Sequence, residues 1–491
     1  MISKPCIVTL LVAATLISNC AVGPDFHKPD APEATGYTKD SIGNIDAQAL
    51  IQDMDIPGQW WTLFKSRQLN ALIESSLQSN PNIQAAEAGL RAARENVKAQ
   101  QGLFYPSVNG SYSGSRQSIA PSIAATDPLP SGQLLFSLYN AQVAVAYTPD
   151  VFGLNHRTVE SLQAQAEIQR FQMLATYLTL TSNIVTAAIQ ESSLRAQIDA
   201  THEIISIETK MLQILRNQLA KGAASELDVA AQESQLAQAK AALPPLENQL
   251  AVQRDLLTAL SGNLSNNEVS EKFKLSDLTL PAKLPLSLPS RLVEQRPDVR
   301  AAEEQLHSAS AAIGVAVANR LPQFTINALG GDTGTNFAHL FNPADRFWSL
   351  TGGITQPIFD GGSLLHKERG AKATYEQAKA QYKATVITAF QNVADTLHAL
   401  KFDADTLHAA TAARDAASKT LELTRRQLQS GSVNYLAVLS AEQAWQQSRI
   451  SLIQAQATRY ADTAALFQAL GGGWWNRRET ITDEKQPTSK N

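Results

Sequence analysis

Two long stretches of the chain contain neither glycine nor proline. The first extends from Leu154 to Lys221 and the second from Ala371 to Ser430. At 1.5 Å per residue, helices of these lengths would measure about 100 Å and about 90 Å. The mean helix of a globular domain is about 11–12 residues long, so such helices do not fit inside one. The sequence therefore predicts an elongated body of coiled-coil-like helices.

Apolar residues in the first stretch follow two adjacent lines. One line has the 3-4-3 spacing of a coiled-coil seam and comprises Ile204, Ile207, Met211 and Ile214. The other runs beside it and comprises Ile205, Leu212, Leu215 and Leu219. Two adjacent seams predict a helix with a neighbour on each side, as in a helical barrel or a wide bundle. The alternative is a helix with one ordinary apolar face in a broad core.

Composition and charge exclude several classes of protein. A chain with 44% hydrophobic and 18% charged residues is too apolar to be disordered. Its formal net charge of −4 gives no electrostatic support for a nucleic-acid partner. The uncharged run from Phe171 to Gln190 contains too many Thr, Ser and Asn residues for a transmembrane helix.

The N-terminus has the pattern of a lipoprotein signal peptide. Residues 1–19 carry Lys4 and an apolar core, and Cys20 follows as the predicted lipid attachment site. An ordinary signal peptide with an incidental Cys20 is the alternative, since Asn19 stands where glycine or alanine is usual. Cys6 and Cys20 are the only cysteines, which excludes an internal disulfide framework and a thiolate metal site.

Five pairs of motifs recur in the same order, and the members of each pair lie 207 to 216 residues apart. The pairs are Asn80-Pro81 with Arg296-Pro297, Tyr105-Pro106 with Leu321-Pro322, Thr148–Phe152 with Thr355–Phe359, Arg216–Gly222 with Arg425–Gly431, and Ala259-Leu260 with Ala469-Leu470. We therefore predict a tandem duplication. Its parts are an N-terminal extension at 20–75, a first repeat at 76–290, a second repeat at 291–475 and a polar tail at 476–491.

Each repeat reads as a helix, two strands and a long helical hairpin. The strands are predicted near 107–118 and 133–149, and near 323–334 and 346–358, where apolar and polar residues alternate as in membrane barrels. A soluble β-hairpin is the alternative for any one pair. Four strands cannot close a membrane barrel, which needs at least about eight, and an open edge cannot sit in lipid. A homotrimer would supply twelve strands.

Several motifs together resemble one family. They are the Cys20–Phe26 start, Trp60-Trp61-x-x-Phe64, the duplicated proline motifs, Gly431-x-x-Asn434-Tyr435-Leu436 and Gly471–Trp475. This set is similar to the TolC-like outer membrane factors of Gram-negative bacteria, in particular the NodT-type efflux lipoproteins. The resemblance implies a mainly α fold with a β-barrel part, in which a homotrimer closes a long helical barrel and a 12-stranded barrel. It also implies that the extension at 20–75 belongs to an equatorial region.

The same resemblance implies the function and the partners. Such a protein is a passive duct in the outer membrane lipid for drugs or other small molecules, delivered by an inner-membrane pump and a periplasmic adaptor. A periplasmic coiled-coil lipoprotein scaffold or adaptor without a pore is the alternative.

The resemblance also suggests a gate at the periplasmic tips of the hairpins, which turn near 222–228 and 431–436. Glycine suits such turns because a helix reversal favours a residue with positive φ, which points to Gly222 and Gly431. By position, Leu436 would be a hydrophobic stopper, and Asp228 an acidic residue that tethers neighbouring helices. Departures from the family pattern are Ser440, where aspartate is common, and Leu428 and Val433, where TolC has tyrosine and arginine. The predicted gate is therefore held closed more by hydrophobic contacts and less by ion pairs. Alternatively, Leu436 and Leu439 are ordinary seam residues.

No residue pattern indicates catalysis. The eight histidines form no HExxH motif and no i,i+4 pair, so neither a metal nor a cofactor is expected. Asp403, Asp405 and His408 are interpreted as a solvated helix face. We expect a protein that is not an enzyme.

Overall fold

The computed structural model describes residues 21–34, 36–39, 48–118 and 135–477. The chain divides into two compact units. Unit 1 comprises the N-terminal segment up to Pro29 together with Leu90–Gln169 and Ala302–Tyr382. Unit 2 comprises Asp30–Gly89, Arg170–Ala301 and the chain from Lys383 onward. Cys20 and the predicted signal peptide lie outside the described residues.

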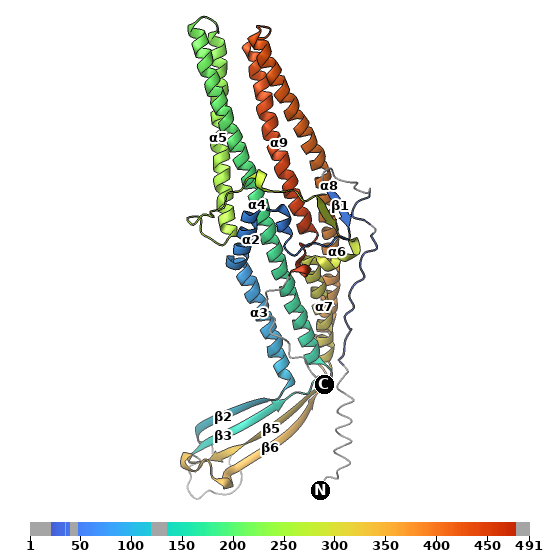
Figure 1. Ribbon diagram of the computed structural model, residues 1–491. Helices are drawn as coiled ribbons and strands as arrows, with labels where there is room; N and C mark the ends of the chain where they lie inside the picture. Colours follow the sequence, from blue (N-terminus) through green and yellow to red (C-terminus); the bar gives the residue numbers. More distant parts are fainter. Residues whose placement is uncertain (1–20, 35, 40–47, 119–134, 478–491) are drawn as a thin grey trace. The chain divides into compact units, whose positions relative to one another are not determined.

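The long glycine-free stretches form two helical hairpins of matching size (Figure 1). Helices α4 (Leu154–Ala220) and α8 (Ser363–Gln429) each have 67 residues, and both α5 (Glu226–Leu260) and α9 (Tyr435–Ala469) have 35. Helix α8 begins earlier than the predicted residue 371, because it includes Gly370. A single glycine inside a helix costs only about 1 kcal/mol, which the other residues of so long a helix offset.

Helix α5 continues through Pro244 and Pro245. Proline has no N–H, so the carbonyls of Lys240 and Ala241 lose their helical donors. These four residues are all exposed, and water can therefore bind the released carbonyls.

Shorter elements flank the hairpins. They are the helices α2 (Arg67–Ser79), α3 (Pro81–Gln101), α6 (Pro289–Gln295) and α7 (Pro297–Ala318), the parallel strands β1 (Ala49–Gln52) and β4 (Lys283–Leu286), and the 3-10 turns η1 (Trp60–Phe64), η2 (Gly102–Phe104), η4 (Leu275–Asp277), η5 (Phe337–His339), η6 (Pro343–Asp345) and η7 (Trp474–Asn476).

The first duplicated motif has the same structural role in both repeats. Pro81 and Pro297 each open a helix, where a missing N–H is harmless. The residue before each proline binds the end of a long hairpin. Asn80 Nδ2 donates to the carbonyl of Leu260 at 2.8 Å, and Arg296 Nη1 donates to that of Ala469 at 3.0 Å.

Unit 1 contains a four-stranded antiparallel sheet in the order β2-β3-β5-β6. Its strands are β2 (Ser107–Ser118), β3 (Leu135–Tyr147), β5 (Gln323–Gly334) and β6 (Arg346–Thr355). β3 and β6 end two and three residues before the predicted ends. Thr148-Pro149 and Gln356-Pro357 follow them, and a proline cannot donate a ladder hydrogen bond.

The two faces of this sheet differ in polarity. Register pairs Val108 with Val145, Val143 with Gly330, and Gly330 with Trp348, so these side chains share one face. On that face the large apolar side chains are exposed, and they include Val108, Tyr112, Val143, Ile326, Trp348, Leu350 and Ile354. The opposite face carries mainly polar side chains such as Asn109, Ser111, Gln142, Thr325, Asn327 and Thr351. One apolar and one polar face are typical of a transmembrane barrel strand.

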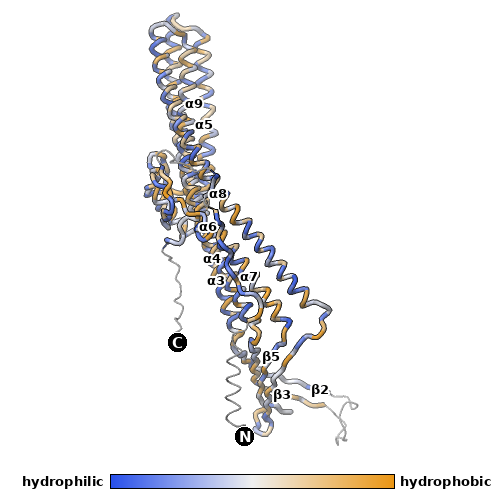
Figure 2. The backbone as a smooth tube through the Cα atoms, turned by 90° about the vertical axis from the view of Figure 1, so that its right-hand side faces the viewer, coloured by the Kyte–Doolittle hydropathy of each residue, from blue (hydrophilic) through white to orange (hydrophobic). Residues whose placement is uncertain are grey.

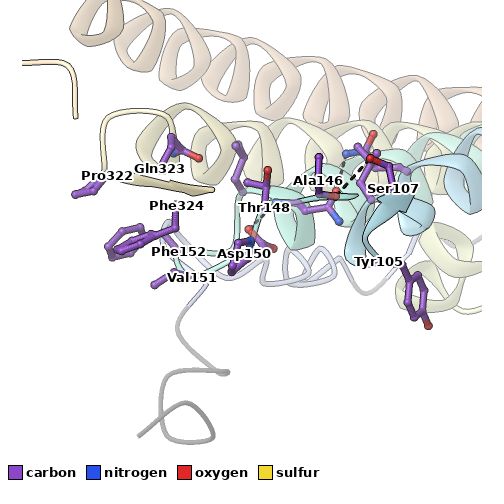
Figure 3. A pocket seen from close by; sticks show the side chains of 15 residues that line it. Tyr105, Ser107, Ala146, Thr148, Asp150, Val151, Phe152, Pro322, Gln323 and Phe324 are labelled. Carbon is purple, nitrogen blue, oxygen red and sulfur yellow. Dashed lines mark hydrogen bonds between the residues drawn. The ribbon is translucent and has the colours of Figure 1, made fainter. Parts of the chain in front are cut away.

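An open pocket of about 350 Å³ lies at the junction of helices and strands in unit 1 (Figure 3). Duplicated motifs from both repeats line it, among them Tyr105, Thr148–Phe152 and Pro322. Asp150 is one of the lining residues, and its Oδ1 accepts from the backbone N–H of Asn155 at 3.0 Å, which caps the start of α4.

Helix packing in unit 2 shows which predicted seam residues of α4 are buried within one chain. The buried line on α4 passes through Ile204, Glu208, Leu212 and Leu215, whereas Ile214 is 49% exposed. The place of Ile214 in a seam toward a second neighbouring helix stays a prediction. Polar and apolar residues are mixed along the hairpins (Figure 2). In the described part of the chain, no helix combines the length and the apolar character that crossing a membrane requires.

Candidate channel gate at the hairpin tips

The turn between α4 and α5 is fixed by its own hydrogen bonds. Gly222 has a φ of +72°, a conformation that favours glycine. The N–H of Ala223 donates to the carbonyl of Gln218 at 2.8 Å and closes α4. Ser225 then caps α5, since its Oγ accepts from the N–H of Asp228 at 3.2 Å. The Asp228 carboxylate accepts from the N–H of Ser225 at 3.0 Å and completes a capping box.

The turn between α8 and α9 repeats this design with different side chains. Gly431 has a φ of +73°, and the N–H of Ser432 donates to the carbonyl of Gln427 at 2.9 Å. Asn434 caps α9, because its Oδ1 accepts from the N–H of Ala437 at 3.1 Å. The two tips are therefore equivalent in backbone form.

Leu436 and Ser440 lie one turn apart on an exposed side of α9. Leu436 is 41% exposed, and Ser440 is also exposed. Their neighbours Tyr435 and Leu439 are buried. Leu439 therefore belongs to the packed seam, whereas Leu436 points away from it.

The other residues predicted to lie near the gate make contacts within their own turn or with apolar side chains. Asp228 Oδ2 accepts from the hydroxyl of Ser225 at 2.7 Å, so its carboxylate binds within its own turn. Leu428 packs against an apolar cluster between α4 and α5 and against another between α8 and α9. Val433 is half-buried.

A buried polar network joins the two hairpins, and sequence reasoning missed it. The Tyr435 hydroxyl donates to Gln232 Oε1 of α5. Gln232 Nε2 donates to Glu208 Oε2 of α4 at 2.5 Å, and Gln446 Nε2 of α9 donates to Glu208 Oε1 at 2.7 Å. Glu208 and Gln232 are both fully buried. The signal in the sequence was Glu208 itself, a charged residue between Ile204 and Leu212 in an apolar line.

Glu442 is a second buried carboxyl close to this network. Arg425 Nη2 donates to Glu442 Oε1 at 2.7 Å, while among the described residues Oε2 has no hydrogen-bond partner. Burial and, to a smaller extent, the charge of Glu208 raise the pKa of Glu442, and Arg425 opposes the shift. Burial thus favours the protonated form of this side chain.

The interpretation of Asp403 as a solvated residue is wrong. Asp403 is half-buried, and burial together with Asp462 of α9 raises its pKa to about 7. Asp405 and His408 are exposed, as expected. The local pattern of α8 could not reveal that α9 covers only one of these three side chains.

Within the ranges that the structure describes, no three His, Cys, Asp or Glu side chains are grouped to hold a metal ion. What the tips offer is an exposed leucine, an exposed serine and a polar contact between two hairpins.

Comparison with known proteins identifies the family to which these features correspond. The family described as outer membrane efflux protein matches residues 72–263 and 288–472. The probable efflux pump outer membrane protein TtgC of Pseudomonas putida is 27% identical, with 96% of each chain aligned. The cation efflux system protein CusC of Escherichia coli is 25% identical over 96% of this chain and 99% of its own. The solved outer-membrane channel OprN is 25% identical with a TM-score of 0.84, covering 93% of this chain and 100% of its own.

Proposed function

As a member of the outer membrane efflux protein family, this chain is an outer membrane channel of a tripartite efflux system, and we propose that it works as a lipid-anchored homotrimeric duct with a gate at Leu436. It is not an enzyme. Its relatives' tripartite systems imply two partners, an inner-membrane pump and a periplasmic adaptor. The alternative of a scaffold without a pore is wrong, because relatives named as efflux pump outer membrane proteins align over nearly the whole chain.

The observation that carries the duct proposal is the four-stranded sheet with one apolar face. Among the described residues, strands β2 and β6 are its two edges, and each pairs with a strand on one side only. Backbone groups of an open edge cannot be satisfied in lipid. Three copies, joined edge to edge, would bring twelve strands and close the barrel. The polar face would then line the water-filled interior.

The position of the N-terminal segment supports a lipid anchor at Cys20. The N–H of Val22 donates to the carbonyl of Phe152 at 3.1 Å, just after β3. The buried Arg157 donates to the carbonyl of Val22 at 3.0 Å and to Asp25 Oδ1 at 2.8 Å. The segment that follows Cys20 is thereby held at the start of α4. Acyl chains on Cys20 would begin beside the strands that enter the membrane.

We infer that the gate residues are Leu436 and Ser440, with Gly222 and Gly431 forming the turns. Leu436 is exposed in the single chain although it is large and apolar, which fits a residue that meets its copies around an axis. Ser440 lies one turn further along the same side. An apolar ring excludes ions through the cost of dewetting a narrow passage rather than through fixed charge. Asp228, expected as a tether, contributes to this proposal through the stability of its own turn.

Channel recordings test the duct. Purified protein in a planar lipid bilayer should produce discrete openings, since a closed barrel continues into the helical tube. Protein unfolded by heat before reconstitution is the control and should produce none. A correctly folded sample that never conducts under any applied voltage would contradict the proposal.

The lipid anchor gives a separate prediction. Cys20→Ala should abolish incorporation of labelled palmitate, because Cys20 is the only cysteine after the predicted signal peptide. Channel activity should remain, since twelve strands anchor the protein independently. Cys6→Ala is the matched control and should keep the label. Palmitate that persists in Cys20→Ala would disprove the attachment site.

A further inference from the structure

The four strands of the sheet, as the structure describes them, contain three charged residues, and all three lie on the apolar face. They are Arg116 of β2, Asp332 of β5 and Arg346 of β6. Asp332 and Arg346 lie opposite each other in the ladder, on the face that carries Trp348. Arg116 shares that face because it follows Tyr112 by four residues. An arginine that faces lipid costs about 2–4 kcal/mol at the middle of a bilayer and about 0–1 kcal/mol at its surface. Arginine on this face is therefore tolerated only at the level of the lipid headgroups.

The three charges lie at the end of the sheet opposite to the end that joins the helices (Figure 1). Arg116 follows Val108 by eight residues in β2, and Arg346 precedes Ile354 by eight residues in β6. Eight residues extend about 26 Å along a strand, at about 3.3 Å per residue. A strand tilt of about 40° reduces this to about 20 Å along the membrane normal, whereas the apolar band of a barrel is about 25 Å tall. Both arginines are exposed, and their long side chains can reach the outer edge of that band.

Aromatic side chains lie next to the arginines on the same face. The ring of Phe337, in the turn η5 after β5, meets Tyr112 and Tyr139 edge-on, at centroid distances of 6.2 Å and 5.9 Å. Trp348 lies two residues from Arg346 and is 81% exposed. Tyrosine and tryptophan are enriched where the hydrocarbon of a membrane meets the headgroups. The arginines therefore lie just outside an aromatic belt, at the level of the outer-leaflet headgroups.

The two arginines lie on opposite edges of the sheet, so a second copy of the chain is needed to bring them together. Arg116 belongs to β2 and Arg346 to β6, and the strand order is β2-β3-β5-β6. The duct proposed above joins β6 of one copy to β2 of the next. Every junction between two chains would then carry one arginine from each. The inference therefore rests on the proposed trimer.

The tandem duplication predicts the register of this junction. Within one chain, Tyr147 of β3 lies opposite Ile326 of β5. The equivalent strands at the junction are β6 and β2, and the motifs that flank them are offset by 207 and 216 residues. Transfer of the pair by these offsets places Trp348 opposite Arg116 of the neighbouring copy, with Arg346 in the diagonal position. Diagonal neighbours are about 7–8 Å apart, within reach of long side chains. A register shifted by two residues would keep both arginines on the same face.

We propose that each junction between two copies binds the phosphate groups of a glycolipid with two phosphates, the chemistry of lipid A in the outer leaflet. Guanidinium groups offer planar pairs of N–H donors that match a phosphate, and they stay charged at any physiological pH. Asp332 Oδ1 lies 3.5 Å from Arg346 Nε, so it orients that arginine and reduces the positive charge of the site. Acyl chains of the same lipid would cover the apolar face beside it, where Leu350 and Tyr112 are exposed.

Lipid binding to the delipidated trimer is the direct test. Native mass spectrometry in mild detergent should count up to three tightly bound molecules of lipid A per trimer, one at each junction. Lipid A with two phosphates should bind about tenfold more tightly than phosphatidylethanolamine, whose headgroup has no net charge, and monophosphoryl lipid A should fall between them. Added salt should weaken the binding, because the contacts are exposed. Equal affinity for all three lipids would overturn the site.

Substitutions of the charged residues should change the affinity in opposite directions. Arg346→Gln and Arg116→Gln should each weaken the binding of lipid A about tenfold, which corresponds to about 1.4 kcal/mol. Asp332→Asn removes the negative charge beside Arg346 and should tighten the binding about threefold. A merely structural role would not produce effects of opposite sign. Arg426→Gln is the matched control, because Arg426 forms an exposed ion pair with Glu422 on α8, outside the strands. It should bind lipid A as the wild type does.

Two results distinguish failure of the lipid site from failure of the trimer. Wild-type affinity for lipid A in trimeric Arg116→Gln and Arg346→Gln samples would overturn the lipid site and leave the duct standing. A folded sample that has the mass of one chain would overturn the junction itself, and the lipid site with it. Should an arginine variant fail to assemble, Asp332→Asn decides instead, and an affinity that this substitution leaves unchanged would overturn the site.

Discussion

Leu436→Ala is expected to raise the single-channel conductance roughly tenfold. Three copies of Leu436 around the axis would form the narrowest ring, and alanine shortens each side chain while favouring the helix. A barrier lowered by about 1.4 kcal/mol corresponds to a tenfold change. Single-channel recording at fixed voltage measures it directly. Cells that carry the variant should also become more permeable to bulky antibiotics.

Leu439→Ala is the matched control for this substitution. Leu439 is 9% exposed and lies in the seam, so its loss should destabilise the hairpin without widening the ring. Ser440→Asp should have a different effect from either, because three carboxylates held close together attract cations. It should increase cation selectivity and make conductance sensitive to divalent ions. A Leu436→Ala channel with wild-type conductance would mean that the constriction lies elsewhere.

The protein is expected to have no stable membrane-inserted monomer. β2 and β6 are edges of 12 and 10 residues, and every unpaired backbone group placed in lipid costs several kcal/mol. An isolated four-stranded sheet therefore cannot remain in the bilayer. Light scattering in mild detergent should give three times the mass of the mature chain.

Urea-unfolded protein provides the reference mass of a single chain in that measurement. It should show one third of the value found for the folded sample. A folded, conducting sample with a monomeric mass would disprove the closure of the barrel by three chains.

Sequence reasoning succeeded where local chemistry decides the structure. The absence of glycine and proline predicted the long helices, and alternating polarity predicted the four strands. It failed where contacts join distant segments. Glu208 was visible as an oddity in an apolar line, but its partners Gln232 and Gln446 lie on other helices, and one of them follows more than 200 residues later. Asp403 likewise gave no local sign that Asp462 lies against it.

The effect of a proline on a helix could also not be predicted without knowing which elements surround it. Pro81 and Pro297 begin helices, whereas Pro244 and Pro245 lie inside one. The difference is whether water reaches the carbonyls that a proline leaves without donors. Exposure of that kind depends on neighbouring elements, so residue type alone does not decide between a helix start and a tolerated interruption.

The equal lengths of the two hairpins limit which insertions and deletions the protein can tolerate. α4 and α8 have the same number of residues, and so do α5 and α9. An insertion of one heptad in both helices of a single hairpin would make its tip project about 10 Å beyond the other. Partner proteins that bind at the hairpin tips would then meet long and short hairpins in alternation. Viable length variants should therefore carry insertions or deletions of matched length in all four long helices. Engineering a shorter duct should likewise remove heptads from all four together.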